Sequence, residues 1–151
     1  MRFHMLLKPK LYLVVAFLII FALLAGACAE RDTVPGLENT TWILEHYGES
    51  GNLQVVLAGS EITVIFDSDQ GQVRGSAGCN QYFGDYHISN DRLSILEIAY
   101  TEMACLEPEG VMEQEQRYLT VFQAAESYQI QDERLQIDCG EQVLIFVAEQ
   151  E

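Results

Sequence analysis

Four cysteines and three histidines are the side chains of this 151-residue chain that are best suited to covalent or metal chemistry. Cys79 stands in the stretch GSAGCNQYFGDYHI, between a glycine and an asparagine, with three aromatic residues behind it. A cysteine in such a place can be a nucleophile, a metal ligand or one end of a disulfide. The charges around it and the compartment of the chain decide between these roles.

The sequence disfavours both the nucleophile and the metal ligand. A nucleophilic cysteine needs a base or a positive field that lowers its pKa. After residue 28 the chain has only His46 and His87, no lysine and all 23 acidic residues, which would raise the pKa of a thiol. Neither C-x-x-C nor H-x-x-x-H spacing occurs. We therefore expect no catalytic residue, no metal site, no cofactor and no enzymatic activity.

The N-terminus has the three parts of an export signal: a positive head, an apolar run and a small-residue exit. These are Arg2, Lys8 and Lys10, then Leu11–Leu24, then Ala25-Gly26-Ala27 before Cys28. The segment LLAGAC resembles a bacterial lipobox, whose cysteine is acylated and becomes the new N-terminus. Two alternatives are an ordinary cleavage site at Ala27-Cys28-Ala29 and a retained membrane anchor. The anchor is disfavoured because Leu11–Ala27 is shorter than the roughly 20 residues that a spanning helix needs.

These features predict a lipoprotein signal peptide at 1–27, a tether at 28–36 and a folded domain at 37–149. Lipidation at Cys28 would hold the chain on the bacterial cell membrane or outer membrane, facing the periplasm or the exterior. After residue 28, five arginines oppose 23 acidic residues, a formal charge of −18. Such a surface repels nucleic acid and anionic headgroups, so the acyl chains alone would bind the membrane.

The folded part is predicted to be an α+β domain. Short runs rich in β-branched residues indicate about eight antiparallel strands, with turns at Asp67–Gly71 and at Asn90-Asp91. One long helix is predicted to open at Pro108 and to stop near Ser127. Its buried stripe should consist of Met112, Leu119 and Phe122, with Val111, Tyr118 and Ala125 beside them.

If the chain is exported, its cysteines are expected to form a disulfide, because thiols oxidise outside the cytosol. Without Cys28 three cysteines remain, so one is free or pairs with another molecule. We favour Cys79 with Cys105, because either position could tie a loop or the helix start to the sheet. Such a bridge would stabilise the fold by about 3 kcal/mol in the chain-entropy account. Cys139, at the end of an alternating strand, is predicted to be a small buried hydrophobic residue.

The residues around Cys79 suggest a strand corner. Glycines permit tight turns there, and Asn80 can bond its neighbouring backbone. Nearby aromatic residues supply apolar area for a core or for a groove. The candidate ligand- or partner-binding residues are Trp42, Asn80, Tyr82, Phe83 and Tyr86.

Several segments together resemble the META domain family: LENTTWIL, GSAGCNQYFGDY, TEMAC and the late YLTVF. The resemblance covers Leu37 to about Val147, and it departs from the usual pattern at Asn39-Thr40, where an extra Thr41 precedes the tryptophan. It implies an antiparallel, barrel-like sheet packed on one helix. It also implies an envelope protein, often lipid-anchored, that is linked to stress or antibiotic tolerance and has no established enzymatic activity.

Two functions follow as expectations. The first is a lipid-anchored module that binds an envelope protein or an apolar ligand, for which a groove large enough for an acyl chain is expected. The second is an inhibitor or chaperone-like partner of envelope proteins that acts through its acidic surface.

Overall fold

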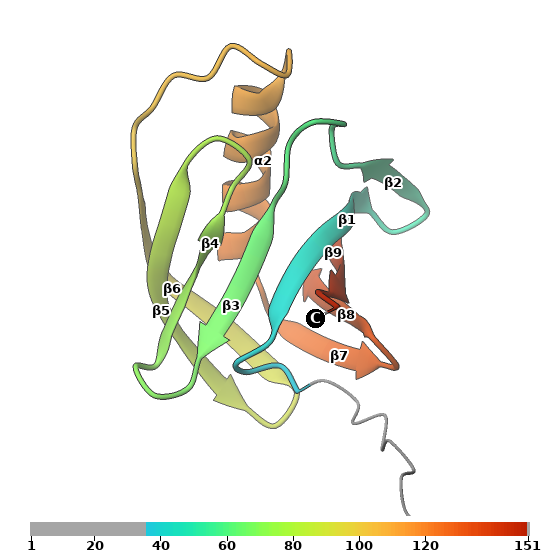
Figure 1. Ribbon diagram of the computed structural model, residues 1–151. Helices are drawn as coiled ribbons and strands as arrows, with labels where there is room; N and C mark the ends of the chain where they lie inside the picture. The colour runs from blue at the N-terminus through green and yellow to red at the C-terminus, as the bar shows by residue number, and fades with distance from the viewer. Residues whose placement is uncertain (1–35, 151) are drawn as a thin grey trace, which may run out of the picture. The chain divides into compact units, whose positions relative to one another are not determined.

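The computed structural model describes residues 36–150, which form nine strands and one helix (Figure 1). The predicted signal peptide, Cys28 and nearly all of the tether lie outside the described residues. The first strands are β1 (Thr41–Glu49), β2 (Asn52–Val55), β3 (Thr63–Asp67), β4 (Gln72–Ser76), β5 (Gln81–Ser89) and β6 (Arg92–Tyr100). Helix α2 (Val111–Gln123) follows, and then β7 (Ser127–Gln131), β8 (Arg134–Cys139) and β9 (Gln142–Ala148).

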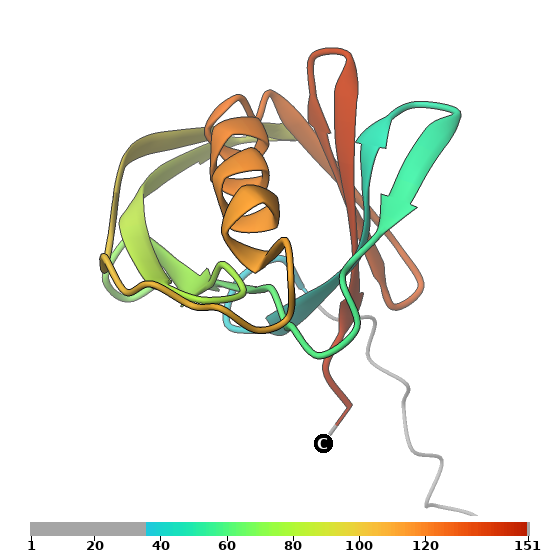
Figure 2. The ribbon, with the colours of Figure 1, turned by 90° about the horizontal axis from the view of Figure 1, so that it is seen from above.

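All nine strands belong to one antiparallel sheet in the order β2-β1-β3-β4-β5-β6-β7-β8-β9. The sheet closes into a ring because β1 also pairs with β9, from Trp42–Ala148 to Glu49–Gln142. The ring is not a regular barrel, since β6 and β7 are joined only at Arg92–Ser127. Figure 2 shows the strands curving round one side of α2. The predicted α+β class, an antiparallel sheet packed on one helix, is confirmed; the sheet is ring-like with nine strands, where about eight in a barrel-like sheet were predicted.

Large aromatic side chains fill the space between the sheet and α2. Trp42, Phe66, Tyr82, Tyr118 and Phe122 are all buried at 1% exposure or less. The rings of Tyr118 and Phe122 stack with their centroids 5.5 Å apart, and Tyr82 meets both rings edge-on. Each fully buried side chain of this kind contributes roughly 1.5–3 kcal/mol, so the cluster stabilises the contact between α2 and the sheet.

Helix α2 begins later than the sequence predicted. Pro108 follows a cis peptide bond and lies in the preceding loop, so its predicted role as the helix opener is wrong. The helix starts after Gly110, whose φ of 86° is left-handed, and the Gly110 carbonyl accepts a hydrogen bond from the Gln114 N–H at 3.0 Å. Glycine suits this position because it adopts a positive φ without steric cost.

The predicted stripe of α2 is confirmed in part. Val111, Tyr118, Leu119 and Phe122 are buried, whereas Met112 is 37% exposed and its predicted place in the stripe is wrong. The helix ends at Gln123, before the predicted stop near Ser127. Ala125 follows the helix, but it still packs against the core.

Both predicted turns are confirmed. At Asp67–Gly71 the Asp67 carboxylate accepts hydrogen bonds from the N–H groups of Asp69 and Gln70, each at 3.1 Å. This bonding of an aspartate to its following backbone is the usual mechanism of an Asx turn. Asn90, with a φ of 59°, makes the turn between β5 and β6.

Gly75 gives a direct test of the close approach between β3 and β4. A Cβ at this position would lie directly against the backbone carbonyl of Thr63 and 3.1 Å from the Tyr82 hydroxyl. Gly75→Ala should therefore lower the free energy of unfolding by about 1–3 kcal/mol, because the strands must separate. Gly36→Ala, where the nearest such atom is 3.9 Å away, is the matched control. Urea unfolding that gave equal midpoints for the two variants would contradict this packing.

Candidate functional site

Cys79 and Cys105 form a disulfide, which confirms the predicted pairing. The bond joins the loop between β4 and β5 to the segment that leads from β6 into α2. Among the described residues, Cys139 is the one free cysteine, and it is buried. The stretch around Cys79 is therefore a cross-linked strand corner.

A buried carboxylate from α2 holds this corner from inside. Glu115 is 4% exposed, and its Oε2 accepts hydrogen bonds from the backbone N–H of Asn80 at 2.6 Å and of Cys79 at 3.3 Å. Its Oε1 accepts a bond from Asn80 Nδ2 at 2.7 Å. Because a buried carboxylate is costly without donors, these three bonds explain why it is tolerated here.

The Asn80 side chain also forms hydrogen bonds with the segment after β6. Its Oδ1 accepts hydrogen bonds from the Thr101 hydroxyl and the Met103 N–H, both at 2.7 Å. Its Nδ2 also donates to the Met103 carbonyl at 3.2 Å. One amide side chain therefore binds helix, loop and strand end together. We call the group of Cys79, Asn80, Cys105 and Glu115 the corner clamp.

A second buried polar residue of α2 holds the loop between β2 and β3. Gln114 is 3% exposed, accepts a hydrogen bond from the Leu57 N–H at 2.7 Å and donates to the Ser60 hydroxyl at 2.8 Å. The sequence interpretation missed both Gln114 and Glu115. The available signal was their spacing, because they fall on the same helical face as Val111 and Tyr118.

Two tyrosine hydroxyls meet in the core beside the clamp. The hydroxyls of Tyr82 and Tyr118 lie 2.7 Å apart, and that of Tyr82 also donates to the Thr63 carbonyl at 2.9 Å. Burial raises the pKa of both tyrosines well above the ordinary value. Burial, followed by the charges of Asp138 and Glu126, raises the pKa of the Cys139 thiol to about 12. These groups stay neutral and protonated at physiological pH.

The five predicted binding residues do not share one surface. Trp42, Asn80 and Tyr82 are at most 1% exposed, and the Trp42 indole N–H donates to the Leu37 carbonyl at 3.1 Å. Tyr86 is half-buried, with its ring edge-on to Phe66. Its hydroxyl donates to Glu38 Oε1. Phe83 alone is largely open to solvent, at 55% exposure.

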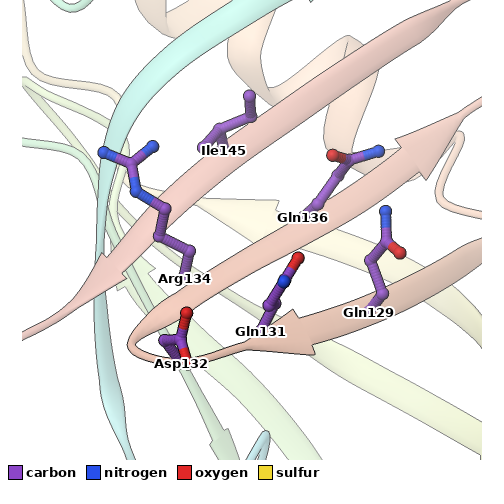
Figure 3. A pocket seen from close by; sticks show the side chains of 6 residues that line it. All are labelled: Gln129, Gln131, Asp132, Arg134, Gln136 and Ile145. Atoms are coloured by element: carbon purple, nitrogen blue, oxygen red, sulfur yellow. The ribbon is translucent and has the colours of Figure 1, made fainter.

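A pocket of about 250 Å³ lies on the outer side of β7, β8 and β9 (Figure 3). Its lining is polar except for Ile145, and direct cross-strand pairs bring Gln129 beside Gln136 and Gln131 beside Arg134. Arg134 also pairs with Glu45 on β1 at 2.8 Å. This polar lining does not suit an acyl chain, which was the ligand expected for a groove.

Several large apolar side chains are exposed elsewhere. By their place in the chain they form two groups, one on β5, β6 and the segment after β6, and one on β2 and the start of α2. The first group holds Phe83, Leu96, Tyr100, Met103 and Leu106, and the second holds Leu53, Val55 and Met112.

Residues 36–150 hold neither a cluster of metal-binding side chains nor a membrane-spanning helix. Nowhere in this range do three or more histidine, cysteine, aspartate or glutamate side chains gather in a way that could hold a metal ion. The same range has no helix of the length and apolar character needed to cross a membrane.

Fold and corner clamp together define a small α+β domain, a ring-like antiparallel sheet with one helix tied to it by a disulfide and a buried carboxylate. The META domain family model matches residues 35–151, and the chain belongs to this family. No curated protein matches the chain.

Solved structures share the fold. A protein from Burkholderia xenovorans, solved by NMR, is 24% identical with a TM-score of 0.65, and the match covers 76% of this chain and 85% of that one. A DUF4847 family protein from Bacteroides vulgatus is 13% identical with a TM-score of 0.53, over 76% of this chain and 96% of that one.

Glu115→Gln tests the clamp. The amide would keep one acceptor oxygen but turn its NH₂ toward a donor of Asn80, so a buried hydrogen bond is lost. We expect the free energy of unfolding to fall by about 1–3 kcal/mol. The exposed Glu113→Gln on the same helix is the control, with a change within about 0.5 kcal/mol. Calorimetry showing equal melting temperatures for the two variants would refute the clamp.

The raised pKa of Cys139 predicts a loss of stability in alkali. The ordinary thiol pKa is 9.0 and the folded value is about 12, so the unfolded chain releases the proton first. The contribution of the thiol is complete below pH 9 and is lost between pH 9 and 12, at up to about 1.4 kcal/mol per pH unit. We expect the free energy of unfolding, measured with urea at each pH, to fall less steeply with pH for Cys139→Ala than for the native chain. If the free energy of unfolding fell equally steeply with pH in both proteins, the thiol would have the same pKa in the folded and the unfolded chain, which would contradict this prediction.

Proposed function

We propose that this chain is an exported, lipid-anchored META-domain protein that serves the bacterial cell envelope as a non-enzymatic binding module. Cys28 is the acylated residue, residues 28–36 are the tether, and the domain faces the periplasm or the exterior. The link to envelope stress or antibiotic tolerance comes from the family resemblance.

The Cys79–Cys105 disulfide is the observation that carries the proposal. Disulfides persist in oxidising compartments and are rare in the cytosol. The cross-link therefore supports export, as do the positive head, the apolar run and the small residues before Cys28.

The state of the reactive groups supports a role without catalysis. Cys79 and Cys105 are consumed in the disulfide, and the pKa of Cys139 is too high for a thiolate at neutral pH. The Glu115 carboxylate is occupied by three donors from the corner. A general acid or base must instead reach a substrate.

Binding is supported by the exposed apolar side chains of β5 and β6, since large apolar patches on a domain surface usually mark interaction sites. The second candidate function is an inhibitor or chaperone-like partner of envelope proteins. The acidic surface favours it, because charge complementarity steers a basic partner.

Cys28→Ser tests the anchor. We expect the native chain in the membrane fraction with its mass raised by the acyl chains, and the variant in the soluble fraction without them. Cys139→Ser, which changes a cysteine that the proposal leaves unmodified, controls for the loss of a thiol. Recovery of the native chain with residues 1–27 attached and all thiols free would sink the proposal.

A further inference from the structure

Phe83 and Leu96 lie on the outer surface of β5 and β6, and Met103 lies in the exposed segment that continues from β6. Phe83 pairs with Ala99 and Asp85 with Leu96, so Phe83 and Leu96 are diagonal neighbours. The Thr101 N–H donates to the Gln81 carbonyl at 3.0 Å, so the chain continues alongside β5 to Met103. We call Phe83, Leu96, Ala99 and Met103 the outer apolar face. All four are exposed, with Phe83 at 55%, Leu96 at 50% and Met103 at 54%.

A β-bulge at Glu97 separates Leu96 from Ala99 on this face. Between the pairs Phe83–Ala99 and Asp85–Leu96, β6 holds one residue more than β5, and Glu97 has a φ of 44°. Leu96 faces outward by the ordinary alternation with the buried Leu93 and Ile95. The bulge interrupts this alternation, so Glu97 is also exposed, while Ile98 packs against the core. Bulges commonly re-aim a side chain in this way.

The corner clamp holds the end of this face rigid. Both backbone groups of Met103 are bonded to the Asn80 side chain, and the disulfide follows two residues later at Cys105. A face that is already ordered loses little conformational entropy when a partner binds.

The border of the outer apolar face is acidic. From Leu93 to Gln116 the chain has six glutamates and no lysine, arginine or histidine. Of these, Glu97 follows Leu96 in the bulge and Glu102 precedes Met103, and both are exposed. Asp85, which pairs with Leu96, is exposed as well. On the β4 side, Arg74 pairs with Phe83 in the sheet register.

We propose that the outer apolar face binds an extended polypeptide segment that is apolar and flanked by lysine or arginine. The apolar side chains of the segment cover Phe83, Leu96 and Met103, and its cations meet Asp85, Glu97 and Glu102. The acidic border argues against a second copy of this chain and against an anionic lipid surface, because both carry like charge. The proposal rests on the proposed function as a binding module and names the chemistry of its partner.

Fluorescent peptides of alternating leucine and lysine, leucine and glutamate, or leucine and serine test this chemistry. The full chain carrying Cys28→Ser, with its disulfide intact, should bind the lysine peptide about tenfold or more tightly than the other two. Raising the salt to about 0.5 M should weaken that binding at least severalfold.

Two double variants assign the surface. Phe83→Ser with Leu96→Ser should weaken binding of the lysine peptide by about tenfold or more, since apolar contact area is lost. Leu53→Ser with Val55→Ser removes two exposed apolar residues from β2 and should leave binding unchanged. Urea midpoints within error of the Cys28→Ser chain show that both variants fold.

Equal losses in the two variants, equal binding of the three peptides, or no binding of any would overturn the proposal. Binding to vesicles of phosphatidylglycerol that is lost in the Phe83 and Leu96 variant would also overturn it in favour of a lipid surface. Failure of the proposed function is seen separately, as an unacylated Cys28 in the native chain.

Discussion

Glu115 is a carboxylate in the interior, and such a group is stable there only where donors surround it. The two N–H groups of the corner and the Asn80 amide meet this need. The same bonds fix the position of α2 against the ring, whose aromatic core depends on that position. The disulfide adds a covalent limit to how far the corner can move. We therefore expect the corner, α2 and the aromatic core to unfold together.

Much of this architecture could be predicted from residues alone. Alternating runs indicated the strands, because one face of a strand packs against the core and the other is exposed to water. The turn at Asp67 and the pairing of Cys79 with Cys105 were likewise predictable, the first from its own side chain and the second from the expected export together with the places of the two cysteines in the chain. The helix stripe was recovered at Tyr118, Leu119 and Phe122, where apolar spacing is clear.

The polar interior could not be predicted in the same way. Glutamate and glutamine are mostly exposed, so Gln114 and Glu115 looked like surface residues although their spacing put them on the buried face. Their partners lie 35 or more residues away in the chain, at Asn80 and Leu57, and only the closed sheet brings them near. The bulge at Glu97 was hidden for a related reason, because the register depends on β5. For the same reason Trp42 and Tyr82, which looked available for a ligand, serve the core.

An ordered corner beside an exposed apolar surface is the arrangement that connects the fold with the proposed binding function. This connection requires the corner clamp to be a permanent structural element. Native-state hydrogen exchange of the Cys79, Asn80 and Met103 amides tests this claim most directly. Exchange should occur only through global unfolding, with the same free energy as the core amides of Phe66 and Leu144. Exchange through a local opening several kcal/mol below the global value would contradict it.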